Sequence, residues 1–151
     1  MGAKVLDSHL ITFHVAYREL VAGPDEVLAQ LGLGRAQQRA LFAIRREPGL
    51  SVGHLARRLG VTTQALHKTL APLAASGLAS VERCEADARA RTIRLTPAGI
   101  ALEDRVTRIQ HDVFARVTRR LGAKAMEEWT TTMRAIATEA RQARGEARDD
   151  R

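Results

Sequence analysis

The chain has 151 residues, a formal net charge of +7 and only 3% aromatic residues. This length suits one domain, and its core has to be built from Leu, Val, Ile and Ala, a composition that favours helices. A single cysteine excludes an intramolecular disulfide framework. With neither a membrane-spanning apolar run nor a signal peptide in the sequence, we expect a cytoplasmic protein.

The positive charge is concentrated in the middle of the chain. Residues 35–91 contain ten Lys or Arg against four Asp or Glu, whereas the rest of the chain contains fourteen against thirteen. A polyanion responds to such a local cationic field more than to a high overall isoelectric point. The charge distribution therefore favours a nucleic-acid partner for residues 35–91.

In chain order, the first expected helix carries apolar residues at helical spacing from Val5 to Val21. Gly23-Pro24 should break or kink it, because proline lacks a backbone donor, and one or two further turns then follow. A second helix is expected from about Arg35 to Glu47, where Pro48-Gly49 stops it.

The next stretch predicts two short helices joined by a tight turn. Ser51 is a good N-cap for the first helix, and Gly60 suits its left-handed end. Val61 is expected to fill the corner of the turn, and Thr62 or Thr63 to cap the second helix. The inward apolar positions of the two helices are Val52, Leu55 and Leu59, then Leu66, Leu70 and Leu73.

The outer face of the second helix is left with four polar residues: Thr63, Gln64, His67 and Lys68. In a major groove, Gln can pair with adenine and Lys can reach guanine or phosphate. This arrangement is typical of a helix-turn-helix, although two amphipathic helices around a glycine also occur in proteins that bind no DNA.

A charged hairpin follows the second helix. Strands are expected near residues 77–83 and 92–96, joined by a tip that contains Asp87, Arg89 and Arg91. A hairpin directly after a recognition helix is a wing, and its arginines can enter a minor groove.

Two long apolar-striped helices complete the chain. Thr96-Pro97 starts one of them and Gly122 ends it, and a last helix follows in which Trp129 is expected to be a core residue. Because helices this apolar need partners, we expect the N- and C-terminal helices to form a homodimer, with a monomeric bundle as the alternative. A two-fold axis would place the recognition helices roughly 34 Å apart, on an inverted repeat of double-stranded DNA.

Three segments resemble the MarR family of bacterial winged-helix regulators: LGLGRAQQRALFAI, LSVGHLARRLGVTTQALHKTLAPLAASGL and DARARTIRLTPAG. The resemblance implies a triangular homodimer that represses nearby genes and is relieved by a small ligand or by oxidation. It implies that Arg89 enters the minor groove and that Asp87 orients it. The sequence departs from the family pattern at Pro72, inside the recognition helix, and in the uncharged Ala74-Ala75-Ser76.

The fold class we expect is therefore mostly α with a small β-hairpin wing. Residues 33–96 form the winged helix-turn-helix, residues 1–32 and 97–145 the dimerisation helices, and residues 146–151 a frayed tail. The expected DNA contacts are Arg35, Gln38, Ser51, Thr62, Thr63, Gln64, His67, Lys68, Arg83, Asp87, Arg89 and Arg91.

A small effector, such as a phenolic or aromatic acid, could be oriented by four residues of the first helix: His9, His14, Tyr17 and Arg18. The alternative is that these are ordinary interface residues. A redox role for Cys84 is a second alternative, because Arg83 beside it can lower a thiol pKa. No metal-ligand spacing, cofactor motif or enzyme signature is present, and we expect no catalytic activity.

The predicted function is sequence-specific DNA binding by a transcriptional regulator, most simply a repressor. The rival interpretation is a winged-helix domain that acts through protein contacts, or a non-specific architectural DNA binder.

Overall fold

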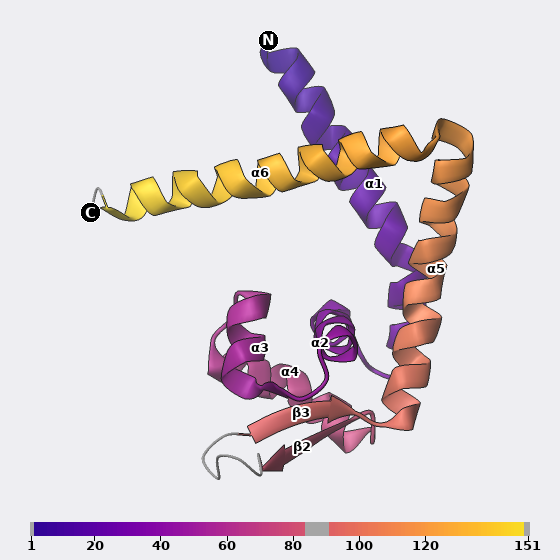
Figure 1. Cartoon of the computed structure of the whole chain (residues 1–151), viewed down its shortest axis with the longest axis vertical. Coiled ribbons are helices and arrows are strands. Elements are labelled where there is room, and N and C mark those ends of the chain that lie inside the picture. Colours follow the sequence, from indigo (N-terminus) through magenta and orange to yellow (C-terminus); the bar gives the residue numbers. More distant parts are fainter. Residues whose placement is uncertain (1, 84–90, 150–151) are drawn as a thin grey trace. The chain divides into compact units, whose positions relative to one another are not determined.

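The computed structural model describes residues 2–83 and 91–149. As predicted, the described residues are mostly helical and include a small antiparallel sheet (Figure 1). The chain divides into two compact units, Met1–Gln110 and His111–Arg151, and each is described by itself.

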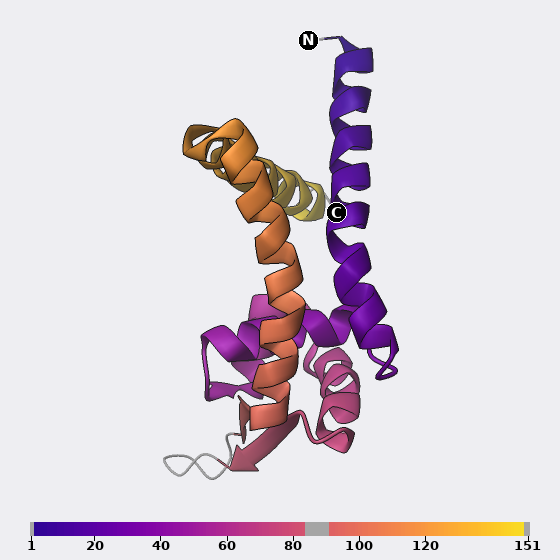
Figure 2. The same ribbon diagram turned by 90° about the vertical axis from the view of Figure 1, so that its right-hand side faces the viewer.

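Helix α1 (Ala3–Ala29) is one continuous helix that contains Pro24 (Figure 2). Of the two outcomes expected at Gly23-Pro24, a break or a kink, the break is wrong, because the helix continues through Pro24 to Ala29. Pro24 lies among the buried residues of the helix, with Val21, Val27 and Leu28. Burial of this face offsets the hydrogen bond that proline cannot donate. Only the C-terminal turns of α1 thus enter the core.

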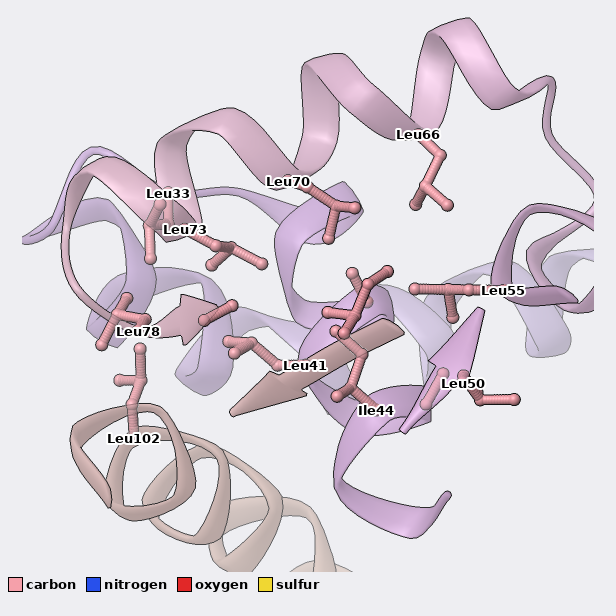
Figure 3. Close-up of a cluster of buried hydrophobic side chains, with 14 of the residues drawn as sticks. Leu33, Leu41, Ile44, Leu50, Leu55, Leu66, Leu70, Leu73, Leu78 and Leu102 are labelled. Carbon is pink, nitrogen blue, oxygen red and sulfur yellow. The ribbon is translucent and has the colours of Figure 1, made fainter. Parts of the chain in front are cut away.

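Three shorter helices form the winged head: α2 (Arg35–Arg46), α3 (Val52–Leu59) and α4 (Thr63–Ala75). Their inward side chains meet in one apolar cluster, drawn in Figure 3, to which the start of α5 adds Leu102. The inward positions of α4 predicted from helical spacing are confirmed, since Leu66, Leu70 and Leu73 are all buried. Val61 is 38% exposed, so the prediction that it fills the corner is wrong.

The sheet has the strand order β1-β3-β2. Strands β2 (Ala79–Arg83) and β3 (Arg91–Leu95) pair antiparallel as the predicted wing, with Val81 opposite Ile93. Strand β1 (Leu50–Ser51) pairs with the other edge of β3, with Leu50 opposite Ile93. Strand β1 was not predicted, because a strand of two residues shows no alternation of polar and apolar residues.

Helix α5 (Pro97–Leu121) begins at the predicted cap. The Thr96 hydroxyl accepts a hydrogen bond from the Gly99 amide at 3.1 Å and donates one to the Gly77 carbonyl at 2.7 Å. Gly122, with φ 86°, ends the helix as expected. Thr96 thereby joins the turn after α4 to the start of α5.

The second unit holds the end of α5 and helix α6 (Ala123–Asp149), which extends into the residues expected to fray. The rings of Phe114 and Trp129 lie 5.5 Å apart. Trp129 is nevertheless 46% exposed, so it is not a core residue of the single chain, contrary to expectation.

Large apolar side chains are exposed on the N-terminal part of α1: Val5, Leu6, Leu10, Ile11, Phe13, Val15 and Tyr17. Leu121, Trp129 and Ile136 are exposed in the second unit. Within the described ranges, no helix combines the length and apolar character needed to cross a bilayer.

Candidate nucleic-acid interface

The helix-turn-helix is built from local caps that the sequence specifies. The Ser51 hydroxyl accepts from the His54 amide at 3.2 Å, and the Thr62 hydroxyl accepts from the Ala65 amide at 3.1 Å. Between them Gly60 adopts the left-handed conformation, with φ 68° and ψ 34°. This conformation is cheap only for glycine, so the turn angle between α3 and α4 is set by these three residues.

Helix α4 presents one polar face to solvent. Its exposed side chains include the predicted residues Thr63, Gln64, His67 and Lys68. They lie in its N-terminal half, opposite the buried leucines, and Thr62 is exposed at the cap. The face offers an amide, an ammonium group, an imidazole and hydroxyls, which are the groups that read base edges in a major groove.

Side chains from α2 hold the recognition helix in place. Arg39 donates from Nη2 to the Leu59 carbonyl at 2.8 Å, which satisfies the C-terminal end of α3. Gln37 donates from Nε2 to the Thr69 carbonyl of α4 at 3.4 Å. Arg39 was not among the predicted site residues. Its place on the outer side of α2, directly before the inward-facing Ala40, is the only feature of the sequence that could have indicated this contact.

The wing carries further positive charge. Arg91 and Arg94 are exposed on β3. Arg94 was missed as a candidate, although its alternation with buried Ile93 marks it as outward-facing. Arg83 belongs to β2, where its backbone pairs with Arg91. Asp87, Arg89 and Cys84 lie outside the described residues.

Three predicted phosphate contacts have other partners in the structure. Arg35 binds Asp25 of α1, with Nη2 2.8 Å from Oδ2, and its guanidinium lies 5.5 Å from the centre of the Tyr17 ring. The half-buried Gln38 amide donates to Gln110 of α5 at 3.3 Å. Ser51 uses its hydroxyl as the cap of α3. The structure thus places these residues in contacts of their own, apart from the polar face of α4.

The hydrogen bond from Arg35 to Asp25 is the main cause that raises the pKa of the Arg35 guanidinium. The guanidinium of Arg35 therefore remains positively charged at neutral pH. Asp25 in turn keeps a second carboxylate oxygen, Oδ1, that is buried and has no hydrogen-bond partner among the described residues.

The four candidate effector residues are all exposed on α1. Tyr17 stacks on Phe13 with their ring centres 6.5 Å apart, and the His14 ring lies 6.0 Å from that of Phe13. Arg18 pairs with Glu19 at 2.7 Å. Among the residues that the structure describes, no cluster of His, Cys, Asp and Glu could hold a metal ion.

Comparison with known proteins identifies relatives of similar sequence. The model of the MarR family matches residues 31–90. The HTH-type transcriptional regulator PetP of Rhodobacter capsulatus is 36% identical over 80% of this chain and 73% of its own length. An HTH-type transcriptional repressor of Mycobacterium tuberculosis is 32% identical over 68% of this chain and 73% of its own.

A structural relative has been solved with a nucleic acid. A mutant of S. aureus MepR bound to an oligodeoxyribonucleotide superimposes with a TM-score of 0.61 at 21% identity, covering 87% of this chain and 97% of that one. At this identity the similarity shows a shared fold.

Proposed function

Because the chain belongs to the MarR family of DNA-binding transcriptional regulators, which are not enzymes, we propose that it is a homodimeric repressor that reads an inverted-repeat operator through α4. The observation that carries this proposal is the exposed face of Thr63, Gln64, His67 and Lys68, backed by buried leucines. The naming of the M. tuberculosis relative as a repressor supports the sign of regulation. The DNA-bound MepR mutant supports the mode of binding.

In this proposal the groove contacts come from residues 62–68 and the wing contacts from Arg83, Arg91 and the tip. Arg89 and Asp87 are assigned to the minor groove by family resemblance alone. The exposed apolar side chains of α1, with Leu121, Trp129 and Ile136, form the dimer interface, because an apolar surface of this extent needs a partner.

Two substitutions on α4 test the proposal in a binding titration on the operator, obtained from the DNA upstream of the chain's own coding sequence. Lys68→Gln should weaken binding and reduce the slope of log K against log salt by about 1.8, because the dimer loses one phosphate contact, worth about 0.9, in each half-site. Gln64→Ala should weaken operator binding more than binding to random DNA, since an amide pair distinguishes one base pair from another.

Lys124→Gln is the matched control, because Lys124 is an exposed lysine of α6 whose side chain is 89% accessible. It should leave affinity and salt slope unchanged. Equal effects of Lys68→Gln and Lys124→Gln would contradict the assigned interface. A wild-type affinity that is the same for operator and random DNA would favour a non-specific architectural binder.

We further propose that a small aromatic acid relieves repression by binding near Tyr17. The support is local: the Arg35 guanidinium lies over the Tyr17 ring, 5.5 Å from its centre, and both side chains are partly exposed, a pairing suited to an aromatic carboxylate. Asp25 Oδ2 binds Nε and Nη2 of this guanidinium, so the ligand carboxylate would be bound through Nη1. His14 and Arg18 would flank such a ligand, and His9 lies further along the same helix. A thermal-shift panel of phenolic acids, with Tyr17→Ala as comparison, tests this, because a ligand of the folded state raises the melting temperature. If no compound of the panel raises the melting temperature of the wild-type protein, this proposal is contradicted.

A further inference from the structure

A buried carboxylate lies between α2 and the first half of α5. Glu103 of α5 is 3% exposed and is the one charged side chain that is buried among the described residues. Its Oε1 accepts hydrogen bonds from Arg46 Nη1 of α2 at 2.6 Å and from the Thr107 hydroxyl at 2.6 Å. A short ionic contact therefore joins the two helices inside the first unit.

The cationic partner is itself fixed. Arg46 Nη1 also donates to the Phe42 carbonyl at 3.1 Å, and the guanidinium carbon lies 3.3 Å from the centre of the Phe42 ring. Both ends of the Arg46–Glu103 pair are thus held by a residue one helical turn away, Phe42 on α2 and Thr107 on α5. The pair has one defined geometry.

This pair is poorly explained by stability alone. The Arg46 side chain is 34% exposed, but removing the Glu103 carboxylate from water is costly, and apolar residues in the place of such a pair are often as stable. The neighbouring Leu102 and Val106 already bury apolar surface in the core, and such contacts have no preferred direction. What charge-assisted hydrogen bonds add is a fixed direction.

We propose that Glu103 is a positioning residue, which together with Arg46 sets the direction in which α5 leaves the winged head. Helix α5 continues to Leu121. At 1.5 Å per residue, the last 18 residues form an arm of roughly 27 Å, so a tilt of about 10° at Glu103 displaces its end by about 5 Å. This inference rests on the proposed function, because two heads read an inverted repeat only at a fixed separation.

The direct test measures this direction without DNA. A chain carrying Cys84→Ser receives spin labels at His54→Cys in α3 and Arg120→Cys at the end of α5, and is diluted with unlabelled protein. Pulsed electron resonance then gives the label-to-label distance within one chain, whether or not the protein is a dimer. We expect a narrow distribution for the parent chain, and a distribution broadened or shifted by about 5 Å for Glu103→Gln, in line with the arm estimated above.

Two further variants separate positioning from stability. Arg46→Met/Glu103→Leu removes both charges and should fold with a melting temperature near that of the parent while still broadening the distribution. Asp104→Asn is the matched control. Asp104 joins the same two helices by an ion pair with Arg45 at 3.3 Å, but this pair is about half exposed to solvent. Since exposed pairs contribute little, it should leave the distribution unchanged.

A binding experiment connects this geometry to function. Operators with one base pair added or removed between the half-sites should bind the parent more weakly than the operator itself. The ratio of the affinity for the operator to the affinity for the altered spacings should fall towards one for Arg46→Met/Glu103→Leu. The same ratio should keep its parent value for Asp104→Asn. A variant that is merely destabilised would weaken binding to all spacings by the same factor.

The proposal is overturned if the double variant keeps the parent distance distribution, or if Asp104→Asn broadens it equally. An unfolded double variant also contradicts it, because the pair would then be a determinant of stability. If the parent shows no operator preference, the proposed function fails, and the distance distributions still decide the role of Glu103.

Discussion

Gly99 of α5 lies directly against the backbone of Leu78, so that a Cβ added at Gly99 would stand 1.9 Å from the Leu78 carbonyl oxygen. That oxygen accepts a hydrogen bond from the Thr96 amide at 3.1 Å. The start of α5 is therefore seated on the segment that links α4 to the wing, and only glycine leaves room for this approach.

Gly99→Ala should accordingly destabilise the fold, because the backbone of Leu78 has to move. We expect a loss of about 1–3 kcal/mol in the free energy of unfolding, the usual range for overpacking. Gly53→Ala is the control. A Cβ at Gly53 meets nothing closer than the flexible end of Arg57 at 3.8 Å, so alanine there should be neutral or stabilise the helix by up to about 1 kcal/mol. Denaturant unfolding of both variants measures the difference, and equal stabilities would contradict the close approach.

Pro72 interrupts the hydrogen-bond ladder of the recognition helix, although α4 continues to Ala75. Pro72→Ala restores an amide that can donate to the Lys68 carbonyl. We expect it to raise the free energy of unfolding by about 1 kcal/mol or more, since proline is costly in a helix interior. Pro48 lies in the exposed turn after α2, and Pro48→Ala should instead lower the free energy of unfolding by about 0.4–1 kcal/mol, because alanine gives the unfolded chain more conformational freedom. Thermal unfolding distinguishes the two signs.

Ile136 tests the dimer interface. It is 53% exposed on α6, and in the proposed dimer it is covered by the partner subunit. Ile136→Lys should place a charge in that interface and shift the sedimenting species towards the single-chain mass of 16.5 kDa. Thr131→Lys adds the same charge on the opposite side of α6 and should leave the mass unchanged. A parent chain that sediments at the single-chain mass would refute the dimer itself.

Arg35 and Lys68 should differ in DNA binding, although both are exposed cations of the head. The guanidinium of Arg35 is already bound to Asp25, so Arg35→Gln should leave the salt slope of operator binding unchanged. Since the pKa of Arg35 is raised, the stability that its charge contributes is present at neutral pH and is lost as pH rises through strongly alkaline values. A slope reduced as much by Arg35→Gln as by Lys68→Gln would restore Arg35 as a phosphate contact.

Local signals in the sequence were sufficient for most of the head. The caps Ser51 and Thr96 and the left-handed Gly60 depend on neighbours within a few residues and were predicted correctly, and Thr62 was one of the two predicted candidates for the cap of α4. The polar face of α4 follows in the same way, because helical spacing alone separates Leu66 and Leu70 from Gln64 and Lys68.

Features that depend on distant partners could not be predicted. Strand β1 exists because β3, some forty residues later, offers a free edge to Leu50. The burial of Glu103 depends on Arg46, and the engagement of Gln38 depends on Gln110. Val61 was misplaced for a related reason: an apolar residue after a glycine turn fills the corner only if the two helices leave space for it. None of these contacts can be predicted from the helix or strand propensities of the residues involved.

The brevity of β1 affects how the molecule associates with others. A sheet edge with unpaired amides and carbonyls is a template for another chain, and proteins commonly shorten such edges to avoid aggregation. Here one edge of the sheet is a strand of two residues, Leu50–Ser51, which runs directly into α3. So short an edge gives an incoming strand almost no hydrogen bonds, which favours association through helix surfaces over strand addition at this edge.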